Sequence, residues 1–248
     1  MTLLCLDAGN TRLKWGLRGL AELRTDAQWL ARGVLAHEAI EQLAARLTDR
    51  PSRILACNVA GPAVAAHIEA LAATLAVPLD WFASSPAACG VANGYDDPAR
   101  LGADRWAALI GARGLHAGPA LVVMAGTATT IDVLEADGRF RGGLILPGLA
   151  LMRRTLARNT AGLPEACGHY RAFPTNTDDA IESGLLQATL GAIERMAAGM
   201  RRPACADFLC LLSGGAAGSL APHLDLPCRQ VDALVLEGLA RAALISSS

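Results

Sequence analysis

A carboxylate and an ammonium group flank a glycine turn near the start of the chain. Asp7 ends the apolar run LLCL, the residues Ala-Gly-Asn-Thr follow, and Lys14 lies at the start of the next apolar stretch. Glycine permits a tight turn, and the turn's amides with the Thr11 hydroxyl can line a concavity that binds phosphate. Asp7 can also orient a hydrated magnesium ion between phosphates. An ordinary hairpin explains the same residues equally well, and the spacing leaves open whether Lys14 faces the turn.

A similar turn opens the second half of the chain. Residues 119–140 are expected to form a strand, an Ala-Gly-Thr turn and a second strand, in the same order as in the first hairpin. Two such hairpins facing each other could grip nucleotide phosphates from both sides, as in the actin, hexokinase and Hsp70 superfamily. The glycine pair at 214–215 follows an apolar strand and could let an adenosine lie against the backbone. Asp132 is a further candidate near the metal, or an ordinary aspartate of an edge strand.

Other routes to nucleotide binding are missing. The sequence contains neither a Walker A motif nor a proper G-x-G-x-x-G, so P-loop and Rossmann sites are excluded. A third candidate region is the polar, Gly/Pro-rich run 84–105, which ends in the residues GADR before an expected helix at 106–115. There Asp104 could simply cap the helix, followed by a solvated arginine.

Composition limits the class of protein. With 248 residues, 52% of them hydrophobic, the chain can bury a sizeable core in one large domain or two. The formal net charge of -1 gives no overall attraction to nucleic acid or to an anionic membrane, so neither is an expected partner. No basic region precedes the first apolar run and no apolar stretch approaches the length of a membrane span, so we expect neither a signal peptide nor a transmembrane segment.

The cysteines are scattered along the sequence. The seven cysteines include no C-x-x-C pair, which fits neither a disulfide framework nor a zinc site. We therefore expect reduced, mostly buried thiols and a cytoplasmic protein. The seven are Cys5, Cys57, Cys89, Cys167, Cys205, Cys210 and Cys228.

Strand-like and helix-like segments alternate, which is the α/β pattern. In the first half we expect strands at 3–9, 13–17 and 52–60 and helices at 35–47, 62–75 and 106–115. In the second half we expect strands at 119–125, 128–134 and 208–212 and helices at 151–159, 180–200 and 231–244. The repeated hairpin indicates two homologous halves, which we divide into domains 1–116 and 117–248.

Seven motifs in order give the chain a family resemblance. They are DAGNTRLK, Tyr95 followed by LGADR, AGTATTID, GGLILPG, TAGLP, NTDDAIESG and LSGG. Together they resemble the type III pantothenate kinases, a family that includes chains described as Bvg accessory factor. The resemblance implies two ribonuclease-H-like domains of the acetate and sugar kinase/Hsp70/actin superfamily, usually in a homodimer with its interface in the second domain. It also implies ATP-dependent phosphorylation of pantothenate to 4'-phosphopantothenate, the first step of coenzyme A synthesis.

The resemblance also implies roles for particular residues. The first domain would hold the phosphate loop and the GADR substrate motif, the second domain a second phosphate loop, and Asp104 would be the proton acceptor. The expected ATP contacts are Asp7, Ala8, Gly9, Asn10, Thr11, Arg12, Leu13, Lys14 and Thr127. The expected pantothenate contacts are Tyr95, Gly102, Ala103, Asp104, Arg105 and Thr177.

The chemistry of these residues agrees with that assignment. A carboxylate such as Asp104 can take the proton of an alcohol as the phosphoryl group is transferred. Arg105 can hold a substrate carboxylate with paired hydrogen bonds, and Tyr95 can supply a hydroxyl and an aromatic wall. Magnesium at Asp7, together with Lys14, would offset the phosphate charge.

The chain departs from the family pattern at Met124. Many members carry an aspartate there, which binds a monovalent cation, K⁺ or NH₄⁺, and a thioether is a poor ligand for potassium. We therefore predict weak or absent potassium dependence, unless another group replaces the missing ligand.

Two other functions stay open from the sequence. One is a regulatory or accessory protein that keeps the kinase scaffold without turnover, and the other is a kinase of another small anionic alcohol. The intact Asp7, GADR motif and Thr127 favour catalysis.

Overall fold

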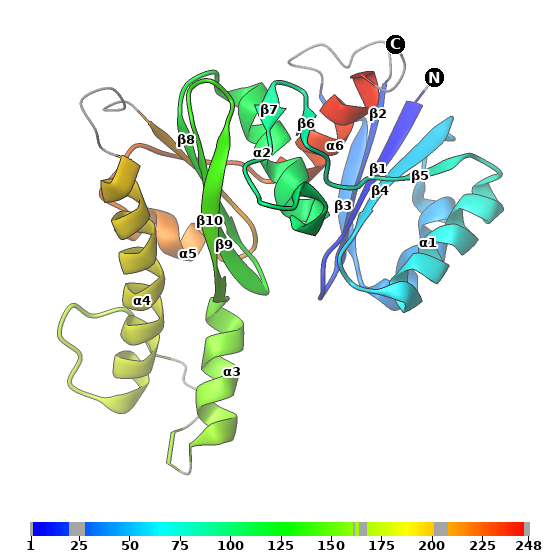
Figure 1. The fold of residues 1–248 in the computed structure, drawn as a ribbon. Helices are drawn as coiled ribbons and strands as arrows, with labels where there is room; N and C mark the ends of the chain where they lie inside the picture. Colours follow the sequence, from blue (N-terminus) through cyan, green and yellow to red (C-terminus); the bar gives the residue numbers. More distant parts are fainter. Residues whose placement is uncertain (1, 20–27, 161, 164–167, 201–207, 246–248) are drawn as a thin grey trace. The chain divides into compact units, whose positions relative to one another are not determined.

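The computed structural model describes residues 2–19, 28–160, 162–163, 168–200 and 208–245. The chain divides into two compact units, shown as ribbons in Figure 1. The first unit comprises Met1–Ala117, Gly138–Phe140 and Ala233–Ser248, and the second comprises Gly118–Asp137 and Arg141–Asp232. The last helix, which lies in the second half of the sequence, is therefore part of the first unit.

The first unit is built on a five-stranded sheet in the order β3-β2-β1-β4-β5. The hairpin expected at the N-terminus is present, and its two strands pair in antiparallel fashion, whereas β1 and β4 are parallel. β2 and β3 are antiparallel, and β4 and β5 are parallel. The strands are β1 (Thr2–Ala8), β2 (Leu13–Gly19), β3 (Ala31–Leu35), β4 (Arg53–Asn58) and β5 (Leu79–Trp81).

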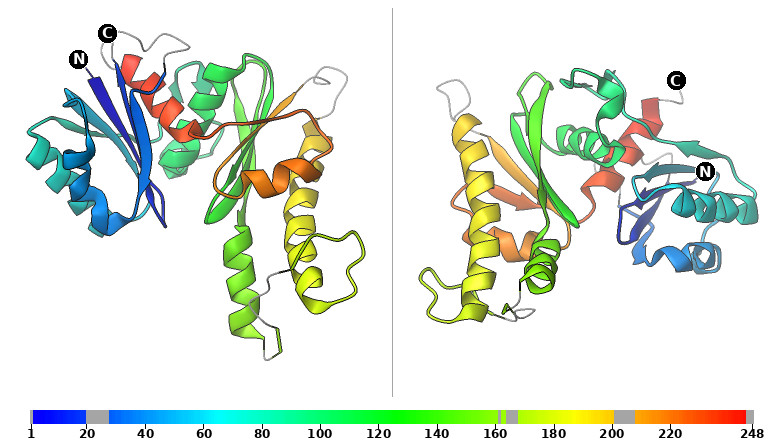
Figure 2. Two further views of the ribbon diagram at one scale, coloured as in Figure 1. Left: turned by 180° about the vertical axis from the view of Figure 1, so that it is seen from behind. Right: turned by 60° about the horizontal axis from the view of Figure 1, so that its bottom comes forward.

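Alternation along β1 divides its side chains between two layers of helices. Leu4, Leu6 and Ala8 belong to a buried cluster with η1 (His37–Arg46) and α1 (Pro62–Leu75). The alternate residues of β1 face α2 (Ala103–Leu115) and α6 (Leu234–Ile245), which contact the sheet from the other side. The sheet of the first unit is thus covered on both faces (Figure 2).

Two glycines let α2 and α6 pack backbone against backbone. A Cβ atom on Gly111 would collide with the carbonyl of Leu234, and one on Gly238 would collide with the carbonyl of Ala107. This close approach holds the C-terminal helix in the first unit.

The second unit repeats the same strand order, as β10-β9-β8-β11-β12. β8 and β9 form an antiparallel hairpin, while β11 is parallel to β8 and to β12. The strands are β8 (Ala120–Ala125), β9 (Ala128–Leu134), β10 (Phe140–Pro147), β11 (Leu209–Ser213) and β12 (Cys228–Gln230). The equal order of the two sheets confirms the internal repeat that the two hairpins indicated.

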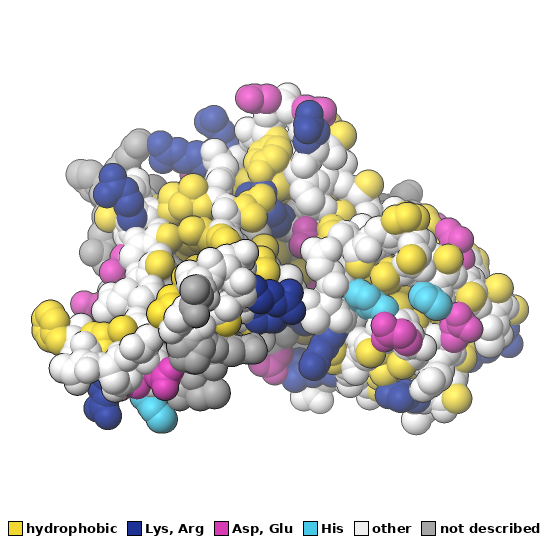
Figure 3. Space-filling view, turned by 90° about the horizontal axis from the view of Figure 1, so that it is seen from below, with side chains coloured by type: hydrophobic (Ala, Val, Ile, Leu, Met, Phe, Trp, Pro, Cys, Tyr) yellow, Lys and Arg dark blue, Asp and Glu magenta, His cyan; other side chains and the backbone are white. Residues whose placement is uncertain are grey.

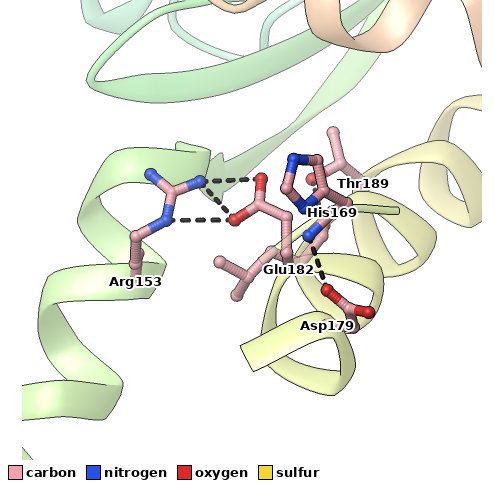
Figure 4. A network of polar contacts seen from close by, with 6 residues as sticks. Arg153, His169, Asp179, Glu182 and Thr189 are labelled. Atoms are coloured by element: carbon pink, nitrogen blue, oxygen red, sulfur yellow. Dashed lines mark hydrogen bonds and ion pairs between the residues drawn. The ribbon is translucent and has the colours of Figure 1, made fainter. Parts of the chain in front are cut away.

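Helices of the second unit complete its core. Leu121, Val123 and Ala125 of β8 cluster with buried residues of α4 (Thr177–Met200) and α5 (Ala217–Leu220). α3 (Leu149–Asn159) packs against α4, and the two helices can be followed in Figures 1 and 2. Three hydrogen bonds from the Arg153 guanidinium to the Glu182 carboxylate, 2.6 to 3.1 Å long, tie these two helices together (Figure 4).

Local structure differs from the sequence prediction in several segments. The helix expected at 35–47 is instead the end of β3 followed by the 3₁₀ helix η1. Its buried residues Ile40 and Leu43 are three apart, which suits three residues per turn. The polar run contains three short elements that the sequence did not indicate, β6 (Ala87–Ala88), β7 (Val91–Ala92) and η2 (Pro98–Arg100), and a further 3₁₀ turn, η3 (Ala221–His223), follows α5.

Candidate active site

Asp7 lies next to the end of β1 with Lys14 directly opposite it on β2. Opposed residues of neighbouring strands point to the same face, so the register places both side chains on the face that α2 covers. Asp7 is only 6% exposed. Burial of Asp7 raises the pKa of its carboxyl to about 6. The positive charge of Lys14 lowers this pKa, and the negative charge of Asp104 raises it.

Asp104 approaches Asp7 from the first turn of α2. Cys57, which pairs with Asp7 across β1 and β4, is a neighbour of both carboxylates. Burial raises the pKa of its thiol, and the negative charges of Asp7 and Asp104 raise that pKa further. The two carboxylates therefore lie near each other in the first unit. One is fixed by the sheet and the other by the start of a helix.

The start of α2 positions Asp104 in a way that differs from simple capping. The N-cap residue is Gly102, not Asp104, and Ala103 is the first residue of the helix. The Asp104 Oδ1 atom accepts a hydrogen bond of 2.8 Å from the Arg105 amide, and the positive end of the helix favours its negative charge. A Cβ on Gly102 would lie 2.7 Å from Asp104 Oδ1, so glycine leaves the space that this carboxylate occupies.

Arg105 is held in an aromatic setting. Its Nη1 donates a hydrogen bond of 2.6 Å to the Tyr95 hydroxyl. Its guanidinium carbon lies 5.5 Å from the ring centroid of Tyr95 and 5.8 Å from that of Phe140. The two rings stack with centroids 5.6 Å apart. Two of the expected substrate residues, Tyr95 and Arg105, are thus in direct contact.

Phe140 is a residue that sequence reasoning missed. It is fully buried and supports both Tyr95 and Arg105, although no motif marks it. The segment that carries it reaches the first unit by pairing with β7, where the Ala92 amide donates a hydrogen bond of 3.0 Å to the Gly138 carbonyl. No local signal in the sequence could have revealed this long-range contact.

The turn after Asp7 presents its central residues to solvent. Ala8 and Leu13 are buried at the strand ends, whereas Asn10, Thr11 and Arg12 are exposed. The carbonyl of Gly9 lies 2.9 Å from the His37 Nε2 atom, in hydrogen-bond contact. His37, at the start of η1, is a second residue of this region that the sequence did not indicate.

Three sequence motifs meet at the turn between β8 and β9 in the second unit. Gly148, which ends the GGLILPG motif, donates its amide to the Thr127 carbonyl at 2.9 Å. Gly214 of the LSGG motif has a φ of +105°, and a Cβ there would collide with the carbonyl of Ala125. The Ala216 amide donates a 3.0 Å hydrogen bond to that same carbonyl. The turn that contains Thr127 is therefore fitted closely to backbone from two other segments, and Thr127 itself is exposed.

Met124 occupies in the second hairpin the place that Asp7 has in the first. It pairs with Thr130 one step before the last pair of the hairpin, as Asp7 does with Lys14. Ser213 pairs with it from β11. The hydroxyls of Thr130 and Ser213 are buried and without a hydrogen-bond partner among the described residues.

Asp132 does not lie where the sequence suggested. It pairs with Val122, one strand repeat further from the turn than Met124, and it is fully buried. β9 lies between β10 and β8, so Asp132 is not on an edge strand either.

Thr177 is the first residue of α4. Asn176 caps this helix by accepting a hydrogen bond of 2.9 Å from the Asp179 amide, while Asp179 also accepts one of 2.8 Å from the His169 amide (Figure 4). The cap explains why α4 begins at Thr177 instead of Ala180. Thr177 lines an open groove of about 640 Å³ in the second unit, with walls that include Leu156 and Leu185.

Within the described part of the chain, other kinds of site are not apparent. No group of three or more His, Cys, Asp or Glu side chains could hold a metal ion there. None of the helices described has the length and apolar character needed to cross a bilayer. In the space-filling view of Figure 3, basic and acidic side chains are interspersed with hydrophobic ones.

Two sheets of the same strand order, each opened by a hairpin with a glycine turn, have the α/β architecture expected of a pair of ribonuclease-H-like domains. The profile of the family described as Type III pantothenate kinase matches residues 3–199. A type III pantothenate kinase from Aromatoleum aromaticum is 51% identical over 97% of this chain and 97% of its own length. The chain belongs to the type III pantothenate kinase family.

Solved structures agree on the fold. A Baf family chain from Campylobacter jejuni superposes with a TM-score of 0.64 at 21% identity, covering 98% of both chains. The activator of 2-hydroxyisocaproyl-CoA dehydratase from Clostridium difficile, which carries bound ADPNP, gives 0.54 at 11% identity and covers 99% of this chain and 94% of its own.

Proposed function

We propose that this protein phosphorylates pantothenate with ATP to give 4'-phosphopantothenate, the first step of coenzyme A biosynthesis. Family membership supports the reaction. The observation that carries it is a cluster of side chains in the first unit. There the Asp104 carboxylate accepts a hydrogen bond from the Arg105 amide, and the Arg105 guanidinium donates one to the Tyr95 hydroxyl.

Asp104 is the proposed base. Phosphoryl transfer to an alcohol depends mainly on position and on charge neutralisation, and a nearby carboxylate accepts the hydroxyl proton as the new bond forms. The hydrogen bond from the Arg105 amide fixes the direction of the Asp104 carboxylate.

Arg105 and Tyr95 are the proposed receptors for the carboxylate of pantothenate. A guanidinium offers several N–H donors in one plane, which suits the two oxygens of a carboxylate. The Tyr95 hydroxyl and the Phe140 ring keep that plane in one orientation. In the second unit, Thr177 is a further proposed contact, at the capped start of α4.

The turn from Asp7 to Lys14 is proposed to bind the phosphates of ATP, with Thr127 as an ATP contact in the second unit. The buried Asp7 carboxylate offers the oxygen ligands that Mg²⁺ prefers, and burial raises the pKa of this carboxyl to about 6. Mg²⁺ bound there would neutralise phosphate charge. Lys14, on the same face, contributes a fixed positive charge.

We further propose that the protein is a cytoplasmic homodimer. Several large apolar side chains of the second unit are exposed, which is typical of a surface that another chain covers; they are Leu144, Ile145, Leu151 and Phe173. The five described cysteines are all free thiols, as is usual in a reducing compartment.

A coupled assay of ADP release tests the proposal. Wild-type protein should turn over ATP only when pantothenate is present. Asp104→Asn should lose at least about a hundredfold in kcat, the usual contribution of a general base, while still binding pantothenate. Asp80→Asn, at an exposed carboxylate on β5, is the matched control and should stay active. Full activity of Asp104→Asn would refute the base role, and an inactive wild type would refute the kinase.

A further inference from the structure

Two cysteines outside the proposed active site lie side by side in the second unit. Cys210 of β11 and Cys228 of β12 are direct partners in the parallel register. The Cys210 amide donates a hydrogen bond of 2.8 Å to the Pro227 carbonyl, which holds the two strands together at this point. Neighbouring strands are about 4.8 Å apart, and the Cα atoms of disulfide-bonded cysteines are usually about 4.4–6.8 Å apart. The backbone therefore already has a spacing that a disulfide can bridge.

The two thiols differ in accessibility and in acidity. Cys210 is fully buried in the core of the second unit, whereas Cys228 packs against that core and is partly exposed. A hydrogen bond from the Cys210 thiol lowers the pKa of Cys228 and raises that of Cys210. Cys228 is thus the more accessible and the more acidic of the two thiols, and Cys210 is the protected one. Cys89 offers a contrast, because burial raises its pKa although it too is partly exposed.

We propose that Cys210 and Cys228 form a reversible oxidation site, which closes to an intrachain disulfide by exchange with a low-molecular-weight disulfide such as oxidised glutathione. The Cys228 thiolate attacks one sulfur of that disulfide, whose S–S bond breaks and releases one thiolate. The released thiolate takes up a proton as Cys210 loses its own. Cys210 then attacks the Cys228 sulfur of the mixed disulfide and releases the second thiolate, which takes up from solvent the proton that Cys228 lost on ionising. Two protein thiols are oxidised and one external disulfide is reduced to two thiols.

The position of Cys228 makes the reaction reversible. A partly exposed disulfide can be attacked by an external thiol, and exposed disulfides are the labile ones. β12 has only three residues and lies at the edge of its sheet, so the bond would fasten an edge strand to the strand that leads into Gly214.

Mass spectrometry of the folded full-length protein tests the proposal. The protein is incubated with oxidised glutathione, free thiols are alkylated, and the chain is cleaved before its aspartates. Asp207, Asp225 and Asp232 then place Cys210 in peptide 207–224 and Cys228 in peptide 225–231. We expect these two peptides to be linked, and to separate on reduction.

Three variants sharpen the result. In Cys210→Ala, Cys228 should stop at the mixed disulfide with glutathione, whereas Cys228→Ser should form no link. Cys89→Ser is the control and should give the linked peptides as the wild type does. With wild-type protein at pH 7, iodoacetamide should modify Cys228 on the order of tenfold faster than Cys89, because the thiolate is the reactive form. If the wild type yields no linked peptides, or if Cys228 reacts no faster than Cys89, the proposal is wrong.

Discussion

At the scale of single residues, Asp7 is an ionisable group whose burial opposes its charge. Its pKa is raised from 3.8 to about 6, so the folded protein holds a proton more tightly than the unfolded chain does. The stability that this proton binding provides is fully present below the unfolded pKa and is lost as the pH rises through about 6. Near neutral pH the ionised carboxylate is therefore kept at a cost in stability, which a bound cation would offset.

This cost leads to a prediction for Asp7→Asn. At pH 7.5 the variant should be more stable than the wild type by on the order of 2 kcal/mol, because it removes a poorly solvated charge. The difference should shrink as the pH falls below about 6, where Asp7 is protonated. Urea unfolding at several pH values measures it, with Asp80→Asn as the control. Turnover of ATP by the same variant should fall, and a destabilised, fully active variant would contradict this view of Asp7.

Phe140 is predicted to act through its neighbours. Phe140→Leu removes the ring on which Tyr95 stacks and over which Arg105 lies. An aromatic pair contributes about 0.5–1.5 kcal/mol, so the KM for pantothenate should rise roughly threefold to tenfold with a smaller change in kcat. Steady-state kinetics compare it with Phe82→Leu, a half-buried phenylalanine of the first unit. Equal KM values in the two variants would show that Phe140 does not orient the substrate residues.

Met124 is predicted to weaken the response to potassium. The family resemblance implies a cation-binding carboxylate at this position, and a thioether does not replace it. Activity should change less than about twofold when KCl replaces choline chloride, and Met124→Asp should increase the response. Strong activation of the wild type by KCl would mean that other groups supply the ligands, and the unpartnered hydroxyls of Thr130 and Ser213 would be the first to replace.

At the scale of elements, local patterns and long-range contacts were not equally predictable. Both hairpins could be predicted, because an apolar run, a glycine turn and a second apolar run are adjacent in sequence. The direction of Lys14 could not, because it depends on the number of residues in the turn and hence on the register. The strand β3 and the 3₁₀ helix η1 were missed because apolar residues three apart also fit an α-helix.

The candidate site shows the same difference between local patterns and long-range contacts. Asp104, Arg105 and Tyr95 lie in one stretch of sequence and carry the family motif, so they could be proposed from the sequence. Phe140 and His37 come from distant segments, and only the path of the chain brings them to Arg105 and to Gly9.

The turn between β11 and α5, which contains Gly214, gives a test at the scale of elements. Gly214→Ala introduces a side chain at a positive φ and against the Ala125 carbonyl, which should destabilise the protein by about 1–3 kcal/mol. It should also raise the KM for ATP. Gly215→Ala is a matched control, since a Cβ at Gly215 meets nothing within 4 Å. Thermal unfolding and ATP titrations compare the pair, and equal behaviour would remove the role given to this turn.

At the scale of the whole molecule, the two copies of the sheet carry different residues of the candidate site. The first copy carries Asp7 and supports Asp104 through α2, whereas the second copy carries Thr127 in a turn packed by Gly148 and Gly214. The C-terminal helix returns to the first unit, so the chain's last segment stabilises the unit that holds the proposed base.

The exposed apolar residues of the second unit yield a prediction about assembly. Ile145 is 64% exposed on β10, an edge strand. If this surface pairs two copies, light scattering should find a dimer for the wild type and a monomer for Ile145→Asp. Trp81→Asp, at an exposed apolar residue of the first unit, is the control and should remain dimeric. A monomeric wild type would contradict the proposed homodimer.

Direct detection of the product is the most decisive measurement. Phosphorus NMR of wild-type protein with ATP, Mg²⁺ and pantothenate should show a phosphate monoester growing in step with ADP, and Asp104→Asn should show almost none. ADP formation without that monoester, or the same yield from both proteins, would contradict the assignment of Asp104 as the base of a pantothenate kinase.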